Sequence, residues 1–168
     1  MKIKNSFLTL ILLFSNLIVG CGILENFGLT QPKLLENVDI NINPVKESYK
    51  TNEVFEITFS GNIDNSKYSE AYIEFDIDFG INTSENDYKN IYFKTSEKAD
   101  FEELLQKFND PIYITLNEFN KTGKQFWFYC TKPYNKISIT PSISAIPVDN
   151  KTSINPGATT TFSFSIKD

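Results

Sequence analysis

Histidine and arginine are both absent from this chain of 168 residues, so all 16 of its basic side chains are lysines. This absence excludes a histidine general base, an imidazole ligand for zinc and a bidentate guanidinium clamp on phosphate. The formal net charge of −5 leaves no basic surplus to neutralise the phosphates of a nucleic acid. We therefore expect no nucleic-acid partner, no cofactor and no enzymatic activity.

The longest apolar run lies near the N-terminus, over residues 7–19. Lys2 and Lys4 precede it, and Gly20 and Cys21 follow it directly. Its 13 residues, three of them polar, are too few to cross a bilayer, because a spanning helix needs about 20 apolar residues. The length and the flanking residues indicate a cleaved export signal rather than a membrane-spanning helix.

The sequence LIVGC at 17–21 resembles the lipobox of bacterial lipoproteins. The resemblance implies that the sulfur of Cys21 carries a diacylglyceryl group and that cleavage makes Cys21 the first residue of the mature protein. Gly22 stands where an aspartate would resemble a signal for retention in the inner membrane. We therefore expect a lipid anchor in the outer membrane or at the cell surface.

The expected signal divides the chain into three segments. They are a signal peptide over 1–20, a lipidated N-terminus and tether over 21–37, and one folded domain over 38–168. A domain of this length buries enough surface to fold without a disulfide or a metal. Once Cys21 is lipidated, Cys130 is the only remaining thiol, so no internal disulfide is expected. Cys130 lies in an apolar strand pattern, which predicts an inert core residue.

Short stretches in which apolar and polar residues alternate recur along the domain, and this is the pattern of strands with one buried face. The apolar sets are Val38, Ile40 and Ile42; Phe55, Ile57 and Phe59; Ile73, Phe75, Ile77 and Phe79; Ile112, Ile114 and Leu116; and Phe162, Phe164 and Ile166. A shorter strand is expected at 91–94. Broken edge strands are expected around Pro141 and Pro147, because proline cannot donate a hydrogen bond to a sheet.

The stretch 97–108 predicts the one helix of the domain, because its apolar residues have the spacing of a single helical stripe. They are Phe101, Leu104, Leu105 and Phe108. Many short strands with one inserted helix indicate an antiparallel β-sandwich. The strand pattern also resembles the immunoglobulin-like domains that are common on bacterial surfaces.

The stretch 112–130 predicts a β-hairpin, because Asn-Lys-Thr-Gly at 120–123 is typical of a type I turn closed by a left-handed glycine. A loop of this length sets the register of the two strands. The register places the side chains of Phe126, Phe128 and Cys130 in the core.

The same register groups Tyr113, Trp127 and Tyr129 on one outer face, which is the candidate binding face. Flat rings with a polar edge stack well on sugars and on partner proteins. The helix expected at 97–108 could instead lie across these rings, because its apolar stripe needs a partner. The sequence leaves both roles open, a packing surface and an exposed patch.

An acidic row lies on the polar face of one strand, at Glu70, Glu74, Asp76 and Asp78. Alternate carboxylates on a strand are about 7 Å apart, within the range of an inverting glycosidase pair. Such catalysis needs a buried acid, whereas the opposite face of this strand is apolar and must face the core. The row is therefore expected to be solvated, with a weak cation site at Glu74, Asp76 and Asp78 as the alternative.

These observations favour a lipid-anchored bacterial envelope protein whose β-sandwich is a non-catalytic interaction or adhesion module. The alternative is a small-ligand module, for carbohydrate, that uses the aromatic face. The covalent lipid on Cys21 would hold the protein to the membrane. The sequence does not identify the protein or glycan partner.

Replacing Cys21 by serine tests the lipid anchor, because serine has no sulfur to receive the lipid. We expect Cys21→Ser to abolish labelling by a clickable fatty acid and to release the protein from membranes. Several acyl chains, each worth about 0.8 kcal/mol per buried CH₂, would otherwise hold it there. Cys130→Ser is the matched control and should leave labelling unchanged, and undiminished labelling of Cys21→Ser would contradict the prediction.

Overall fold

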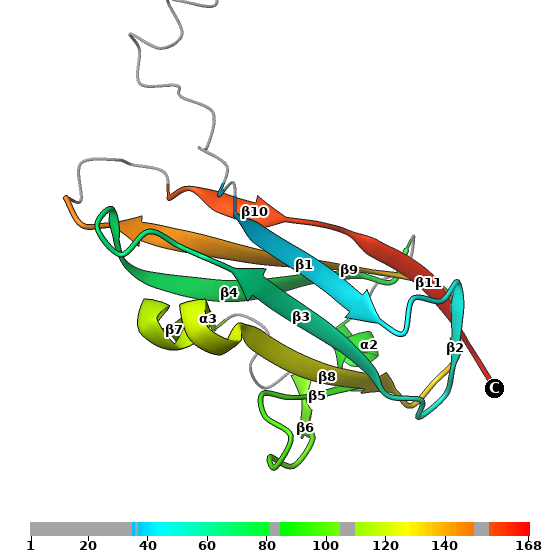
Figure 1. Ribbon diagram of the computed structural model, residues 1–168. Coiled ribbons are helices and arrows are strands. Elements are labelled where there is room, and N and C mark those ends of the chain that lie inside the picture. Colours follow the sequence, from blue (N-terminus) through cyan, green and yellow to red (C-terminus); the bar gives the residue numbers. More distant parts are fainter. Residues whose placement is uncertain (1–34, 36, 81–84, 105–109, 150–154) are drawn as a thin grey trace, which may run out of the picture. The chain divides into compact units, whose positions relative to one another are not determined.

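The computed structural model describes residues 35, 37–80, 85–104, 110–149 and 155–168 (Figure 1). They belong to the second of two compact units of the chain, Leu34–Asp168. The lipobox belongs to the first unit, Met1–Lys33, and lies outside the described residues. Among the described residues, no helix is long and apolar enough to cross a membrane.

The first of two sheets, the five-stranded sheet, has the strand order β1-β3-β8-β5-β6. Every neighbouring pair in it is antiparallel. Its strands are β1 (Val38–Asn43), β3 (Phe55–Gly61), β5 (Ile91–Lys94), β6 (Glu102–Glu103) and β8 (Lys124–Cys130).

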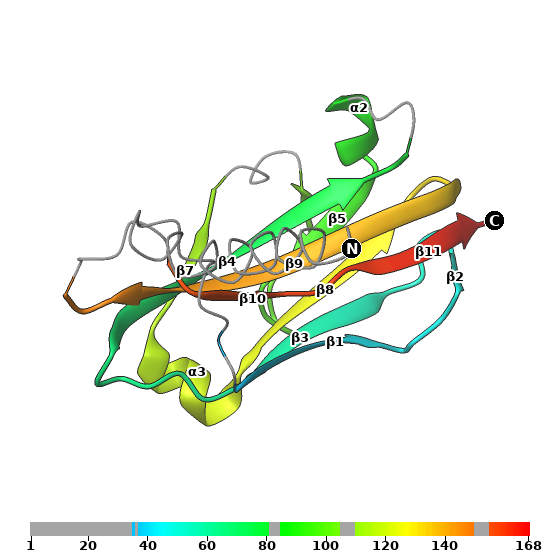
Figure 2. The same ribbon diagram turned by 90° about the horizontal axis from the view of Figure 1, so that it is seen from above.

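The second sheet, the six-stranded sheet, has the order β2-β11-β9-β4-β7, and β10 also pairs with β9. Only β2 and β11 run parallel to each other. Its strands are β2 (Ser48–Lys50), β4 (Tyr68–Asp78), β7 (Ile112–Ile114), β9 (Tyr134–Pro147), β10 (Gly157–Thr159) and β11 (Phe162–Lys167). The two sheets pack face to face, as Figures 1 and 2 show from two directions.

The expected antiparallel β-sandwich of immunoglobulin-like pattern is confirmed. The order β1-β3-β8-β5 matches strands A-B-E-D of an immunoglobulin domain, and β11-β9-β4 matches strands G-F-C. After β1 the chain passes to the other sheet through Pro44, which follows a cis peptide bond, and continues as β2. β7 departs from the immunoglobulin order, because it lies beside β4 but comes after β5 in the chain.

The alternating strands bury the side chains that their sequence patterns place inside. Phe55, Ile57 and Phe59 of β3 are at most 1% exposed, and their polar neighbours face solvent. The buried residues of both sheets form one hydrophobic cluster, and no polar or charged residue among the described ones is buried. Period-2 patterns therefore located the core correctly.

Phenylalanine rings from both sheets meet at the centre of this core. The ring of Phe75 in β4 lies 5.0 Å from that of Phe126 and 5.1 Å from that of Phe128, both in β8 of the other sheet. The ring of Phe59 in β3 lies 6.1 Å from that of Phe75 in an edge-to-face arrangement. Such contacts add to the stabilisation from burial itself and hold the two sheets in register.

The helix expected at 97–108 is wrong over its described part. Residues 97–101 are turn or irregular, Glu102–Glu103 form β6 against β5, and 105–108 lie outside the described residues. Phe101 packs on an outer face of the sandwich, whereas Leu104 is buried in the core. A chain that passes around a sheet edge buries residues three apart on its two sides, and this spacing imitates a helical stripe.

The hairpin expected at 112–130 is also wrong, because β7 and β8 belong to different sheets. A helix, α3 (Leu116–Thr122), lies between them and buries Leu116 and Phe119. Gly123 has the positive φ expected, 67°, but it ends this helix instead of closing a turn. A Cβ at Gly123 would lie 2.3 Å from the backbone oxygen of Phe59, so only glycine fits there.

A second short helix, α2 (Glu85–Tyr88), follows β4. The hydroxyl of Tyr88 donates a hydrogen bond of 2.9 Å to the carbonyl of Ile77. Its ring lies 5.3 Å from that of Phe79, which is half-buried just beyond the end of β4. α2 thus covers the last apolar residue of the β4 pattern.

The edge strands expected around Pro141 and Pro147 are instead one central strand, β9, paired on both sides. Pro141 lies opposite Phe75 of β4. Its carbonyl accepts a hydrogen bond from the backbone nitrogen of Thr160, at the break between β10 and β11. In a strand, the N–H and the carbonyl of one residue face the same neighbouring strand. Proline has no N–H to donate to that strand, and the break between β10 and β11 lies where this hydrogen bond would otherwise be needed.

Truncating Phe75 tests the interlocked core. Phe75→Ala removes a ring that three rings of the other sheet contact, so it should lower the free energy of unfolding by about 3–5 kcal/mol. Asp76→Asn changes the next residue, which is exposed, and should cost less than about 0.5 kcal/mol. Urea denaturation of both variants measures the difference, and a large loss for Asp76→Asn would contradict a solvated acidic row.

Candidate functional site

Four partly exposed rings gather on the outer face of the five-stranded sheet, and we call them the aromatic cluster. They are Tyr92 of β5, Trp127 and Tyr129 of β8, and Phe101, which precedes β6. The pairing of β5 with β8 places Tyr92 opposite Tyr129 and Lys94 opposite Trp127. Because alternate residues of β8 are buried in the core, the residues between them must face outward.

Three rings of the aromatic cluster, those of Tyr92, Phe101 and Tyr129, lie against one another. Tyr92 and Tyr129 stack in nearly parallel planes, 3° apart, with their centroids 5.0 Å apart. The ring of Phe101 meets that of Tyr129 edge-to-face at 4.7 Å. Burial raises the pKa of the Tyr129 hydroxyl, and the neighbouring Tyr92 adds to this rise. The cluster is thus a preassembled, partly desolvated surface.

A lysine lies between two rings of the cluster. The ammonium nitrogen of Lys94 lies 5.0 Å from the ring centroid of Phe101 and 5.4 Å from that of Trp127. It also donates a hydrogen bond of 2.8 Å to the backbone carbonyl of Glu97. These contacts restrain the turn that carries Phe101 against the sheet.

The structure brings together only two of the three residues of the expected binding face. Trp127 and Tyr129 share a face, whereas Tyr113 lies on the outer face of the six-stranded sheet, because β7 pairs with β4. The cluster also contains Tyr92 and Phe101, which the sequence pattern did not place there. The alternation at 91–94 turns Tyr92 outward, but only the pairing of β5 with β8 puts it beside Tyr129.

Tyr113 is 63% exposed, the largest exposed fraction of an aromatic side chain among the described residues. Its ring centroid lies 5.9 Å from that of Tyr72 in β4, with the two planes 51° apart. The register of β4 with β7 places these two tyrosines directly opposite each other. The outer faces of the two sheets therefore each carry tyrosines.

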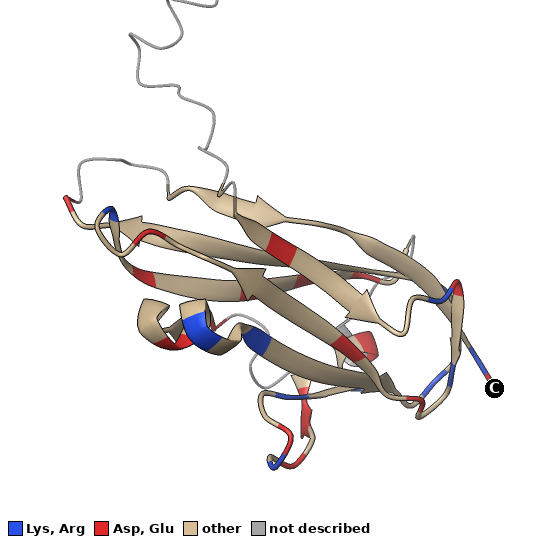
Figure 3. Ribbon diagram, in the orientation of Figure 1, with Lys and Arg blue, Asp and Glu red and all other residues tan. Residues whose placement is uncertain are grey.

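The acidic row lies on the outer face of the six-stranded sheet, where acidic positions recur along β4 (Figure 3). Glu74, Asp76 and Asp78 are all exposed, as expected of a solvated face. β9 places hydroxyl side chains opposite them, at Ser142, Thr140 and Ser138 respectively. No group of three His, Cys, Asp or Glu residues in the described part of the chain could hold a metal ion.

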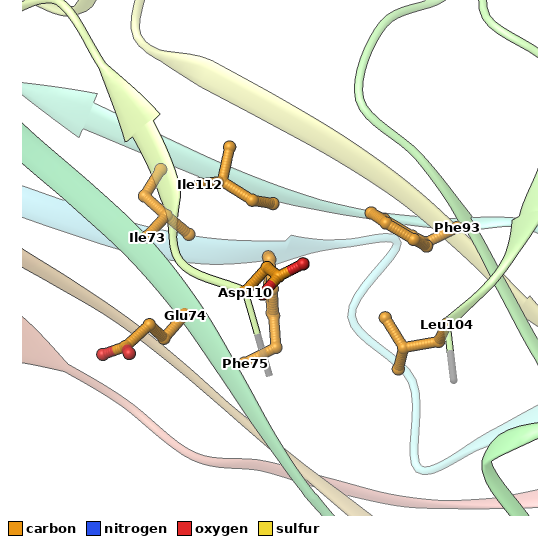
Figure 4. Close-up of a pocket in the computed structure, with 7 residues that line it drawn as sticks. All are labelled: Ile73, Glu74, Phe75, Phe93, Leu104, Asp110 and Ile112. Atoms are coloured by element: carbon orange, nitrogen blue, oxygen red, sulfur yellow. The ribbon is translucent and has the colours of Figure 1, made fainter. Parts of the chain in front are cut away.

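A small pocket between the sheets lies beside the end of β6 and the start of β7, with Asp110 and Glu74 among its lining residues; the carboxylate of Glu74 points away from the other lining side chains (Figure 4). The other lining residues are apolar: Ile73, Phe75, Phe93, Leu104 and Ile112. The cavity volume there is about 10 Å³, far below the usual size of a ligand site. An apolar floor of this kind is a continuation of the core.

Cys130 is fully buried at the end of β8, whereas Cys21 lies outside the described residues. Burial raises the pKa of the Cys130 thiol to about 12. Because the thiolate is the nucleophile, a thiol that stays protonated at neutral pH is inert. The expectation that Cys130 is a core residue is confirmed, and the raised pKa agrees with the expected lack of reactivity.

No protein-family model matches this chain, and no curated protein matches it. One similar solved structure, described as "AvmM Catalyzes Macrocyclization in Alchivemycin A Biosynthesis", has a TM-score of 0.47 and 13% identity, covering 80% of this chain and 91% of its own. Another is a cohesin module from a Clostridium perfringens family 33 glycoside hydrolase, with a TM-score of 0.36 and 14% identity, covering 78% and 96%. Likenesses this distant say nothing about what this chain binds.

The reactivity of Cys130 should follow its raised pKa. In the full chain carrying Cys21→Ser, we expect Cys130 to resist iodoacetamide at pH 8 to 9 and to react once the protein is unfolded in guanidinium. Reaction in the folded state should appear only as the pH rises towards 12. Mass spectrometry measures the modified fraction, and rapid alkylation of the folded protein at pH 8 would show that the thiol is accessible and ionised.

Proposed function

We propose that this chain is a lipid-anchored protein of the bacterial envelope, and that its β-sandwich is a non-catalytic module that binds a protein partner through the aromatic cluster. The observation that carries the proposal is the gathering of Tyr92, Phe101, Trp127 and Tyr129 on one outer sheet face. Tryptophan and tyrosine contribute most to protein–protein binding when they are clustered and preorganised. A partner that covers this face gains from burying rings that are already ordered.

The geometry of the rings favours a protein partner over a glycan at this face. A sugar ring stacks on a free aromatic face, but Tyr92 and Tyr129 each turn one face towards the other. Trp127 has the ammonium group of Lys94 over its ring. The cluster therefore has fewer free ring faces for a sugar, and its mixture of rings, hydroxyl groups and an ammonium group suits the mixed surface of a protein.

The location rests on the sequence around Cys21, which resembles a lipobox. A lipid on Cys21 would hold the domain at the outer membrane or the cell surface, where partners are other envelope proteins or proteins of a host. The absence of histidine and arginine and the buried, protonated Cys130 support a role without catalysis.

Site-specific photo-crosslinking in intact cells tests the proposed interaction face. A photoreactive phenylalanine analogue at Gln125, an exposed residue of β8 beside Trp127, should form a covalent adduct with one partner protein. The same analogue at Asp76, exposed on the opposite sheet, is the positional control and should give no such adduct.

Two alanine variants complete the experiment. Trp127→Ala should reduce the adduct formed from Gln125 at least fivefold, because it removes the largest ring of the cluster. Tyr113→Ala removes an exposed ring from the other sheet and should leave the adduct unchanged. Equal adducts from Gln125 and Asp76, or an adduct insensitive to Trp127→Ala, would exclude the aromatic cluster as the binding face.

A further inference from the structure

A hollow at one edge of the sandwich lies apart from the aromatic cluster. It is lined by the end of β7, by α3 and by the start of β8, and its residues are Tyr113, Ile114, Thr115, Glu118, Phe119, Gly123 and Lys124. Its cavity volume is about 130 Å³, below the usual range of an enclosed small-ligand site, so a ligand bound here would stay partly exposed to solvent. It forms because this connection passes from one sheet to the other through a helix.

Lys124 is an unusual residue for its position. It pairs with Phe59 and shares the inward parity of Phe126 and Phe128, so its side chain starts on the core side of β8. Its ammonium nitrogen lies 6.0 Å from the ring centroid of Phe126. The side chain is half-buried, and within the described part of the chain its ammonium group has neither an ion pair nor a hydrogen bond.

A half-buried ammonium group that has neither an ion pair nor a hydrogen bond is favourable only if an anion or water satisfies its three donors. The hollow that Lys124 lines also contains a hydroxyl group, on Thr115, and a carboxylate, on Glu118. Tyr113 adds a ring that is 63% exposed. The connection from β7 through α3 to β8 thus brings an exposed ring, hydrogen-bonding groups and a cationic group to the lining of one hollow.

We propose that this hollow binds an acidic sugar residue, a pyranose ring that bears a carboxylate. The ring stacks on Tyr113, and its carboxylate pairs with Lys124 in a charge-assisted hydrogen bond. Thr115 and Glu118 hydrogen-bond the sugar hydroxyls. Glu118 also orients the ring, because its negative charge repels the carboxylate of the sugar and directs it to Lys124.

Each part of the proposed ligand is matched to a different residue. A neutral sugar would leave the ammonium group of Lys124 without a counter-charge, whereas a small anion would leave the ring of Tyr113 unused. The site does not depend on the aromatic cluster, because Tyr113 and Trp127 lie on opposite sheets. A glycan could therefore be held here while a protein partner occupies the other face.

Titration of the purified full chain with methyl β-D-glucuronide, followed by NMR chemical shifts, tests the site. We expect shifts to be concentrated in residues 113–124. Methyl β-D-glucoside and sodium acetate, the neutral sugar and the anion alone, should each bind at least tenfold more weakly. Equal binding of the glucoside would overturn the role of Lys124, equal binding of acetate would overturn the role of Tyr113, and no binding of the glucuronide would overturn the site.

Variants separate the two contacts. Lys124→Gln should weaken glucuronide binding about tenfold or more, because it removes a charged hydrogen bond, and Lys124→Arg should restore most of the affinity. Tyr113→Ala should weaken binding about fivefold. Lys121→Gln, which changes an exposed lysine of α3 outside the hollow, is the matched control and should bind as the wild type does.

Thermal melting of each variant checks that the fold is intact before its affinity is compared. An equal loss of glucuronide affinity in Lys121→Gln and Lys124→Gln would show that any nearby positive charge has the same effect. That result would overturn the proposal. Trp127→Ala should leave glucuronide binding unchanged. If the partner crosslink fails while glucuronide binding is intact, the aromatic cluster is the wrong site. If glucuronide does not bind while the crosslink forms, the hollow is the wrong site.

Discussion

The packing of phenylalanine rings across the two sheets is the constraint on which the other features of this domain depend. Phe75 of the six-stranded sheet contacts Phe126 and Phe128 of the five-stranded sheet, and burying each ring contributes about 1.5–3 kcal/mol. Once Phe126 and Phe128 face inward, the pleat of β8 turns Trp127 and Tyr129 outward. The aromatic cluster on the surface is thus a geometric consequence of the aromatic core beneath it.

The connections at the sheet edges determine what each surface becomes. Between β5 and β6 the chain turns so that Phe101 covers Tyr129 from outside, and Leu104 then enters the core. On the way from β7 to β8 the chain forms α3, and Gly123 allows the close approach to Phe59 that starts β8. The first connection completes the aromatic cluster, and the second encloses the hollow at Lys124.

The two outer faces of the sandwich differ in chemistry, although both belong to strands with similar inner faces. The five-stranded sheet presents rings and one lysine held between them. The six-stranded sheet presents the acidic row of β4 beside hydroxyl side chains of β9, and hydroxyl pairs continue to β11, with Ser138 and Ser163 2.8 Å apart. A module with two unlike faces can bind one partner without blocking the other face.

Much of the local structure could be predicted from the amino-acid sequence. Strands such as β3, β4 and β5, and the inward direction of Phe75, follow from a period of two, which is a property of neighbouring residues. The burial of Phe126 is confirmed, but it was predicted from a hairpin that the structure does not contain. Errors arose where a local pattern had two physical explanations. The spacing of Phe101 and Leu104 fits a helix and also fits a chain that crosses a sheet edge, and the glycine at 123 fits a turn and also fits a helix end.

The sequence by itself determined which residues are buried in the strands where apolar and polar residues alternate, such as β3 and β4, that the domain is a β-sandwich, and that histidine and arginine chemistry is excluded. Only the tertiary structure decided that β7 and β8 belong to different sheets, which separates Tyr113 from Trp127 and places Tyr92 beside Tyr129. The reason is that alternation specifies the two sides of a strand but not its neighbours. Strand neighbours are chosen by contacts between residues far apart in the chain, which combine hydrogen bonds, ring packing and the lengths of the connections.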